Sequence, residues 1–292
     1  MRRSPRDLWT LLRETSIEWF NDRSTRRGAA LAYYTIFSLA PILILAIAIA
    51  GLFFGEDAAR GEIVAQIGGL IGRDGARAIQ AMIENAARPG AGTLAALLGL
   101  VTLLIGATSA LAELKDDLDE IWDAPPEKVN GFWYFVTKRL LSVGLILALG
   151  FLLLVSLAFS AVVSALAQLW GPTRATGLML SLLEVFNFLL SFVLVTGLFA
   201  MIYKILPAVR IAWRDVIVGA VVTALLFNVG KFLIGMYLGN SAIGSSYGAA
   251  GSVILILVWV YYSAQIFLFG AEFTKAYAYR FGSRSTGQIG QN

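Results

Sequence analysis

The sequence places two charged residues, Glu184 and Lys231, well inside long apolar stretches. An ionisable side chain at the centre of a bilayer costs about 2.5 to 3.5 kcal/mol, so it is expected to be paired, hydrated or functional. Counting 1.5 Å per helical residue, Glu184 lies roughly 13 Å and Lys231 roughly 10 Å from the same outer boundary. We therefore predict that the two side chains lie at a similar depth in the outer half of the membrane.

Two asparagines accompany these charges. Asn187 follows Glu184 by three residues, and Asn228 precedes Lys231 by three. Residues three apart share a helical face, so antiparallel neighbours joined by a short loop would turn these two faces toward each other. We predict a Glu184/Lys231 pair that points into the helix bundle or into an outward-facing cavity. A static ion pair that only fixes helix packing is the alternative, and the sequence leaves it open.

A second polar face is predicted on the last apolar stretch. Gln265 and Glu272 are seven residues apart and share one helical face, with Gln265 near mid-membrane and Glu272 near the cytoplasmic boundary. The basic residues within reach of Glu272 are Lys204, Arg210 and Arg214. The face is either a buried polar seam between helices or the lining of a substrate path. Asp215, at the same boundary, fits a helix N-terminus and needs no further role.

An acidic cluster lies in the polar segment from Ser109 to Asp123, opposite an apolar helical stripe. Its five carboxylates are Asp116, Asp117, Asp119, Glu120 and Asp123. Such a cluster offers oxygen ligands for a divalent cation, but a solvated face of an amphipathic helix is the interpretation we favour. We therefore predict no metal site and no cofactor.

The loop from Leu238 to Ser252 is rich in glycine and serine and carries no charge. Exposed backbone amides in such turns can hold an anion such as a phosphate headgroup. The candidate anion-binding residues are Ser241, Gly244, Ser245, Ser246 and Gly248. The sequence has no GxxxxGK[ST] motif, so we expect no P-loop for nucleotide hydrolysis.

Composition indicates a lipid environment. Of the 292 residues, 58% are hydrophobic and 14% are charged, whereas soluble domains have about 45 to 50% apolar and about 25% charged residues. The chain contains no cysteine and no histidine, which excludes disulfides, thiolate nucleophiles, imidazole bases and the usual zinc ligands. Because no catalytic constellation remains, we predict that the protein is not an enzyme.

The fold class predicted is an all-α polytopic membrane protein with six transmembrane helices, since about 20 apolar residues cross the hydrocarbon core. The expected spans are about 29–54, 93–112, 140–169, 175–203, 215–238 and 251–274. Short amphipathic helices are expected at the N-terminus, in the first external loop, where we predict two, and after the second span. Pro41 predicts a kink or unwinding in the first span.

Three parts of the chain are expected: a cytoplasmic amphipathic segment over 1–28, a transmembrane domain over 29–279, and a disordered cytoplasmic tail over 280–292. Orientation follows from lysine and arginine. The N-terminal segment, the connections 113–139 and 204–214, and the C-terminal tail hold 7, 4, 3 and 3 of them, whereas the opposite connections hold 4, 1 and 0. The positive-inside rule therefore predicts that both termini are cytoplasmic.

Three stretches carry a family resemblance. They are GAALAYYTIFSLAPILILA at 28–46, the polar segment at 109–122, and YGAAGSVILILVWVYYSAQIFLFGAEFTKAYA at 247–278. Together with Trp213-Arg214-Asp215-Val216 and Gly230-Lys231, they resemble the YihY/BrkB family of bacterial inner-membrane proteins, once misnamed ribonuclease BN. The resemblance implies a role in envelope integrity, with movement of phospholipid or lipopolysaccharide precursor among the proposals and cation/proton antiport as an alternative.

The function predicted is transport or translocation of a lipid or another amphiphile in the inner membrane. A ribonuclease is excluded on chemistry, because the chain has no basic and aromatic groove and its acidic cluster would repel RNA. A cation/proton antiporter and a non-transporting scaffold for envelope assembly are the alternatives. The partners expected are membrane lipids, further copies of the chain and proteins of envelope lipid transport, but no nucleic acid.

Overall fold

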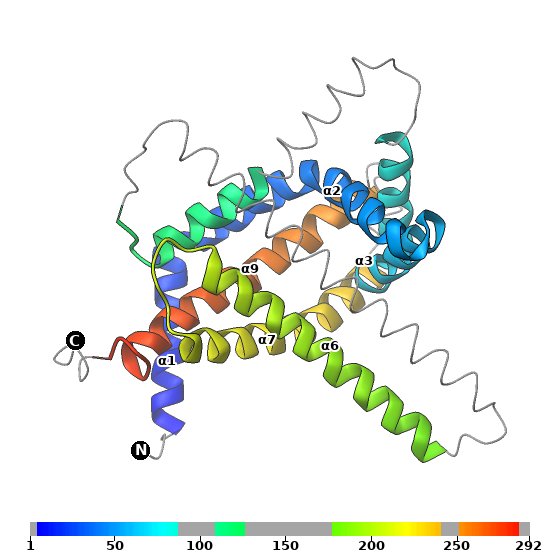
Figure 1. Ribbon diagram of the computed structural model, residues 1–292. Coiled ribbons are helices and arrows are strands. Elements are labelled where there is room, and N and C mark those ends of the chain that lie inside the picture. The colour runs from blue at the N-terminus through cyan, green and yellow to red at the C-terminus, as the bar shows by residue number, and fades with distance from the viewer. Residues whose placement is uncertain (1–4, 87–108, 126–176, 241–250, 286–292) are drawn as a thin grey trace.

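The computed structural model describes residues 5–86, 109–125, 177–240 and 251–285 (Figure 1). All regular secondary structure in these ranges is helical, as predicted. The helices are α1 (Pro5–Asn21), α2 (Ser24–Phe54), α3 (Glu56–Ala86), a helical segment at 109–121, α6 (Gly177–Ile205), α7 (Trp213–Asn240) and α9 (Gly251–Arg280). The predicted span 140–169, most of the span 93–112, and the glycine- and serine-rich residues 241–250 lie outside the described residues.

Three of the described helices are long and apolar enough to cross a membrane. The stretches are Phe188–Ile205 in α6, Trp213–Ile234 in α7 and Val253–Arg280 in α9. These three stretches support the assignment to a membrane. The total of six spans stays a prediction.

Helix α9 is the central helix of the described structure. It packs against α1, α2, α3 and α7, and Figure 1 shows it running between them. Small residues let it approach α7 closely: a side chain at Gly219 would overlap Thr274, and one at Gly270 would overlap Thr223 and Tyr203. Close helix approach through small residues is a main source of packing energy in membranes.

A buried tyrosine connects α6, α7 and α9 where α7 and α9 cross. The Tyr203 hydroxyl on α6 donates to the Phe267 carbonyl on α9 at 2.7 Å and lies 3.1 Å from Thr223 Oγ1 on α7. Tyr203 is only 1% exposed, and Leu268 and Ala271 beside it are fully buried. The hydroxyl is therefore satisfied inside the core, as a buried polar group requires.

One local expectation for the first third of the chain is wrong, and another is answered in part. Helix α2 runs without interruption through Pro41, so the chain does not unwind there, while the kink stays a prediction. Proline removes one backbone hydrogen bond, which does not end a helix of 31 residues. Residues predicted to form two short helices form the single helix α3, which continues through Gly68, Gly69 and Gly72. Its buried side chains pack against α2 and α9, and this packing offsets the low helix propensity of glycine.

Helix α1 buries only a narrow face. Leu11 packs against Phe273 and Tyr277 of α9, whereas Trp9 and Phe20 are 71% and 69% exposed. One face of α1 packs on α9, and another face is exposed. The exposed face is therefore available for the predicted contact with lipid headgroups.

Candidate functional site

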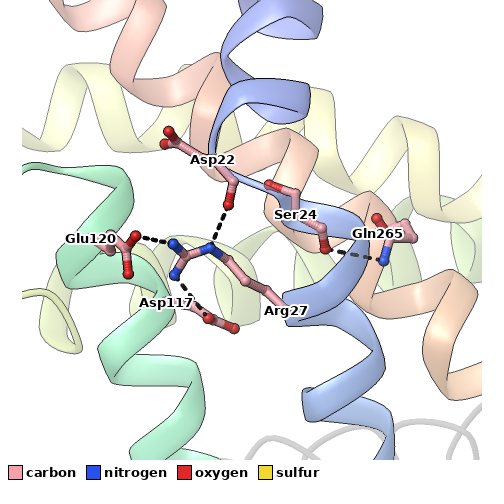
Figure 2. A network of polar contacts seen from close by, with 6 residues as sticks. All are labelled: Asp22, Ser24, Arg27, Asp117, Glu120 and Gln265. Carbon is pink, nitrogen blue, oxygen red and sulfur yellow. Dashed lines mark hydrogen bonds and ion pairs between the residues drawn. The ribbon is translucent and has the colours of Figure 1, made fainter.

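Among the described residues, a network of polar side chains joins the α1–α2 turn, the helical segment 109–121 and the second half of α9. We call it the polar junction and define it by Asp22, Arg27, Asp117, Glu120, Asp123, Glu272 and Lys275. Figure 2 shows its centre, where one guanidinium has three partners. Arg27 Nε donates to the Asp22 carbonyl at 2.7 Å, Nη1 lies 3.3 Å from Asp117 Oδ1, and Nη2 contacts the Glu120 carboxylate. The rigid fork of arginine suits such multiple contacts.

Local sequence explains how this arginine is positioned. Arg23 adopts a left-handed conformation (φ 53°) between α1 and α2 and interrupts the helix there. Arg27 follows within the first turn of α2, where a cation is disfavoured by the helix dipole. Asp117 and Glu120 are three residues apart and so share the helical face that meets it. The two acids therefore neutralise a charge that α2 alone would not favour.

Asp117 is the buried member of this ion pair. Its side chain is 4% exposed, and its Oδ2 has no hydrogen-bond partner within the described structure. Burial raises the pKa of Asp117 to about 6, against the opposing effect of the Arg27 charge, and the nearby acids Glu113 and Glu120 add to the increase. The favoured interpretation of the acidic cluster as a solvated face is therefore wrong for this residue.

Asp119 and Asp123 of the cluster also contact residues outside their own helix. Asp119 contacts Lys115 and accepts a hydrogen bond from the Ala208 amide at 2.6 Å, and Asp123 lies 2.6 Å from Lys275 Nζ. The cluster thus attaches its helix to α2, to the α6–α7 connection and to α9. In the ranges that the structure describes, no three acidic side chains come together in an arrangement suited to a metal ion.

Glu272 is a buried member of the polar junction. It is 1% exposed, and neither of its carboxylate oxygens has a hydrogen-bond partner among the described residues. The carboxylate of Asp22 faces it, and Lys275 is the cation in its vicinity. Of the predicted partners, Lys204 instead donates to the Ile211 carbonyl and lies 5.5 Å from the Trp213 ring centroid.

Asp215 has a larger role than a favourable position at a helix N-terminus. It is fully buried, and its Oδ2 accepts hydrogen bonds from the Ser283 amide at 3.0 Å and the Ser283 hydroxyl at 2.6 Å. The start of α7 is thereby tied to the turn that follows α9. No local sequence pattern indicated this contact across 68 residues.

The predicted polar centre in the outer half remains a prediction. Lys231 has an exposed side chain, and Asn228 donates to the Ala224 carbonyl of its own helix at 2.8 Å. Glu184 and Asn187 lie on α6, but their side chains are outside the described residues. Gln265, the other predicted polar residue, joins the α1–α2 turn, because its Nε2 donates to the Ser24 carbonyl at 3.3 Å (Figure 2).

Two largely apolar openings lie beside these polar groups. The first, which we call the central cavity, has a volume of about 280 Å³ and lies between α2, the segment 109–121, α6, α7 and α9. Its polar lining consists of hydroxyls from Thr35, Ser38 and Ser263. The second, which we call the α1 groove, has a volume of about 420 Å³ and lies between α1, α7 and α9. Apolar walls with a few polar groups are typical of small-molecule sites.

Sequence comparison places the chain in a known family. A model of the family described as "Virulence factor BrkB" matches residues 17–291. The chain belongs to the BrkB family. The resemblance drawn from residues 28–46, 109–122 and 247–278 is therefore confirmed, and these BrkB-family stretches supply α2, the acidic segment and α9 of the polar junction.

Known relatives of this BrkB-family chain are described as membrane proteins. A UPF0761 membrane protein of Stenotrophomonas maltophilia (strain K279a) is 26% identical over 261 residues, which cover 89% of this chain and 59% of that protein. A UPF0761 membrane protein of Pseudoalteromonas atlantica is 28% identical over 258 residues, covering 87% and 81%. The chain thus spans about 59% of the length of the Stenotrophomonas relative. No solved structure matches the chain.

Proposed function

We propose that this BrkB-family protein binds a lipid or another amphiphile, such as a phospholipid or a lipopolysaccharide precursor, and moves it along or across the bacterial inner membrane. The observation that supports this most is the central cavity. Its walls include Leu111, Phe199 and Phe267, and its few hydroxyls lie among apolar side chains. A cavity of this kind between membrane helices accommodates an acyl chain better than a hydrophilic solute.

A reconstituted transport assay tests this proposal. The full chain is placed in phospholipid vesicles that contain a fluorescent phospholipid, and its transfer between leaflets or to acceptor vesicles is measured. Ser263→Phe inserts a ring into the central cavity and should slow transfer. Ser191→Phe makes the same change at an exposed position of α6 and should leave the rate unchanged. Transfer by the natural protein no faster than in empty vesicles would overturn the proposal.

Cation/proton antiport is the second candidate, because Glu272 offers a buried carboxylate with no hydrogen-bond partner among the described residues. Ionisable groups buried in membrane helices often mark proton relays. Proton flux driven by a sodium or potassium gradient in the same vesicles, and its loss in Glu272→Gln, would favour antiport. Vesicles that show neither proton flux nor lipid transfer would favour the third candidate, a scaffold for envelope assembly.

The proposal also includes four further expectations. The protein has no enzymatic activity, its partners are membrane lipids and envelope transport proteins, it self-associates, and both of its termini are cytoplasmic.

The topology has a direct test, because the chain lacks cysteine and any single introduced cysteine is unique. Arg284→Cys should react with a membrane-impermeant thiol reagent from the cytoplasmic side only. Gly61→Cys should react only from the opposite side, and the reverse pattern would invert the proposed orientation.

A further inference from the structure

The polar junction contains one buried carboxyl group that has no ion pair in the described part of the chain. Glu272 of α9 is 1% exposed, and neither of its oxygens has a hydrogen-bond partner among the described residues. Burying an isolated ionised carboxylate is so costly that such a group normally becomes neutral instead. The charge of Glu272 therefore depends on the groups that surround it.

The charges around Glu272 do not balance its own. On the side of α1, the charged groups that act on it are Asp22 and Glu18, and both are acids. The cation is Lys275, about one turn further along α9. Lys275 Nζ lies 2.6 Å from Asp123 and also faces Asp22. One ammonium group therefore serves three carboxylates, and its ion pair is with Asp123.

Arg27, the other cation of the polar junction, is engaged by different partners. Its guanidinium contacts Asp117, Glu120 and the backbone carbonyl of Asp22 (Figure 2). Glu120 can be balanced by solvent, because 67% of its side chain is exposed, whereas Glu272 is shielded from solvent. Burial and nearby like charges both disfavour an ionised carboxylate.

The polar contacts that attach the α1–α2 turn and α1 to α9 include a long hydrogen bond and an exposed ion pair. Gln265 Nε2 donates to the Ser24 carbonyl at 3.3 Å, and Arg280 Nη1 lies 2.6 Å from Glu14 Oε1. Exposed ion pairs contribute little to stability. Regions held by few strong contacts open locally more easily than the core of a protein.

We propose that Glu272 is a proton-binding site, which carries a proton while the α1–α2 turn is packed on α9 and releases it to water when the turn separates from α9. A metal ion would need several converging oxygen ligands, and the described residues offer no such group of three acids. A proton needs only one carboxylate. Packing of the turn and binding of the proton are therefore linked.

This proposal goes beyond the proposed function, because it does not depend on what the protein moves. It also differs from antiport. A proton that is bound and released on one side of the membrane produces no flux across it.

Infrared spectroscopy detects the proton directly, because a protonated carboxyl group has a C=O stretching band that an ionised carboxylate lacks. The full chain is measured at about pH 8 in a maltoside detergent, which has no carbonyl group. We expect the band in the natural protein and its loss in Glu272→Gln. Asp117→Asn should keep the band, since the pKa of Asp117 is raised only to about 6 and this group is ionised at that pH.

Thiol labelling measures the opening of the turn. The chain lacks cysteine, so Ser24→Cys provides a single thiol at a fully buried position, and Thr25→Cys provides one at the exposed neighbouring position. Dividing the first labelling rate by the second removes the pH dependence of the reagent. Because opening releases one proton, this ratio should rise at least about threefold from pH 7 to pH 9, and at most about tenfold per pH unit.

The same ratio in chains that also carry Glu272→Gln should not change with pH, because glutamine has the shape of the protonated acid and no proton to release. A constant ratio with Glu272 in place would overturn the proposal, and this result does not require that Glu272→Gln folds. An equal rise in the Glu272→Gln chains, or an infrared band that Glu272→Gln leaves unchanged, would overturn it as well. The expected results, combined with no proton flux in vesicles, would refute antiport and leave the proton site in place.

Discussion

The two ends of the α6–α7 pair are built in opposite ways. At the polar junction end, Asp117, Trp122, Asp215 and Glu272 are each at most 3% exposed, and ion pairs connect segments that are far apart in the sequence. At the other end, α6 exposes Val185, Phe186, Phe188 and Leu189, each by more than half. Figure 1 shows this end of α6 extending away from the other described helices.

The contrast separates two kinds of packing. Ion pairs connect the described helices at one end, whereas the far end of α6 exposes apolar side chains in the described part of the chain. Substitutions at the two ends test whether this division is real.

Removing the central arginine should have the largest effect. Arg27→Met leaves the buried Asp117 carboxylate without its cation, and loss of one partner of a buried pair costs about 3 to 5 kcal/mol. We expect the lower end of this range, since Arg27 is 16% exposed. The measurement is the thermal unfolding midpoint in detergent. Arg26→Met, at an exposed position one residue earlier, is the control, and equal effects of the two would contradict a fixed junction.

Asp117 should make stability depend on pH. Because its pKa is raised to about 6, the folded chain binds more protons than the unfolded chain between about pH 4 and pH 6. Its contribution to stability is therefore largest below about pH 4 and is lost as the pH rises to about 6, by at most about 3 kcal/mol.

The measurement compares unfolding midpoints of the natural protein and Asp117→Asn across this pH range in detergent. The variant should lose less stability between pH 4 and pH 6. Asp116→Asn changes an exposed carboxylate of the same helix and should follow the natural protein. Parallel curves for all three proteins would show that Asp117 is not buried as described.

Adding one methyl group where α7 and α9 cross should cost about 1 to 3 kcal/mol, since overpacking forces side chains or backbone to move. The variants are Gly219→Ala and Gly270→Ala, whose new methyl groups would overlap Thr274 and Thr223. Gly197→Ala on α6 is the control, because no atom lies within 4 Å of the methyl group it adds. Lower midpoints only for the first two would confirm the close approach of the helices.

Changing Lys231, on the half of α7 that lies away from the polar junction, should affect stability least. Lys231→Met alters an exposed side chain, and such changes usually stay within about 0.5 kcal/mol. If Lys231 and Glu184 form a functional pair, Lys231→Met and Glu184→Gln should both reduce lipid transfer at normal protein abundance. Loss of abundance without an intrinsic transport defect would assign the pair to helix packing instead.

Sequence reasoning predicted the helical class and the membrane setting, because long apolar stretches directly reflect the solvent around them. It also predicted the apolar stripe that buries Leu118, Ile121 and Trp122, since helical spacing is a local property. It missed the contact of Arg27 with Asp117, which joins residues 90 apart. Nothing in local spacing shows which helix an acidic face will meet. The short helices expected around Gly68 and Gly72 failed for the same reason, because packing on α2 and α9 decided the outcome.

The position of α9 in the chain has a consequence for biogenesis. This helix contacts α1, α2, α3 and α7, yet the ribosome completes it after all of them. The earlier helices are therefore synthesised before their common partner, and the surfaces that α9 covers, such as the one around Gly219, stay uncovered until residues 251–280 have been added. Quality-control proteases would meet this half-assembled form in any chain that is truncated before residue 251.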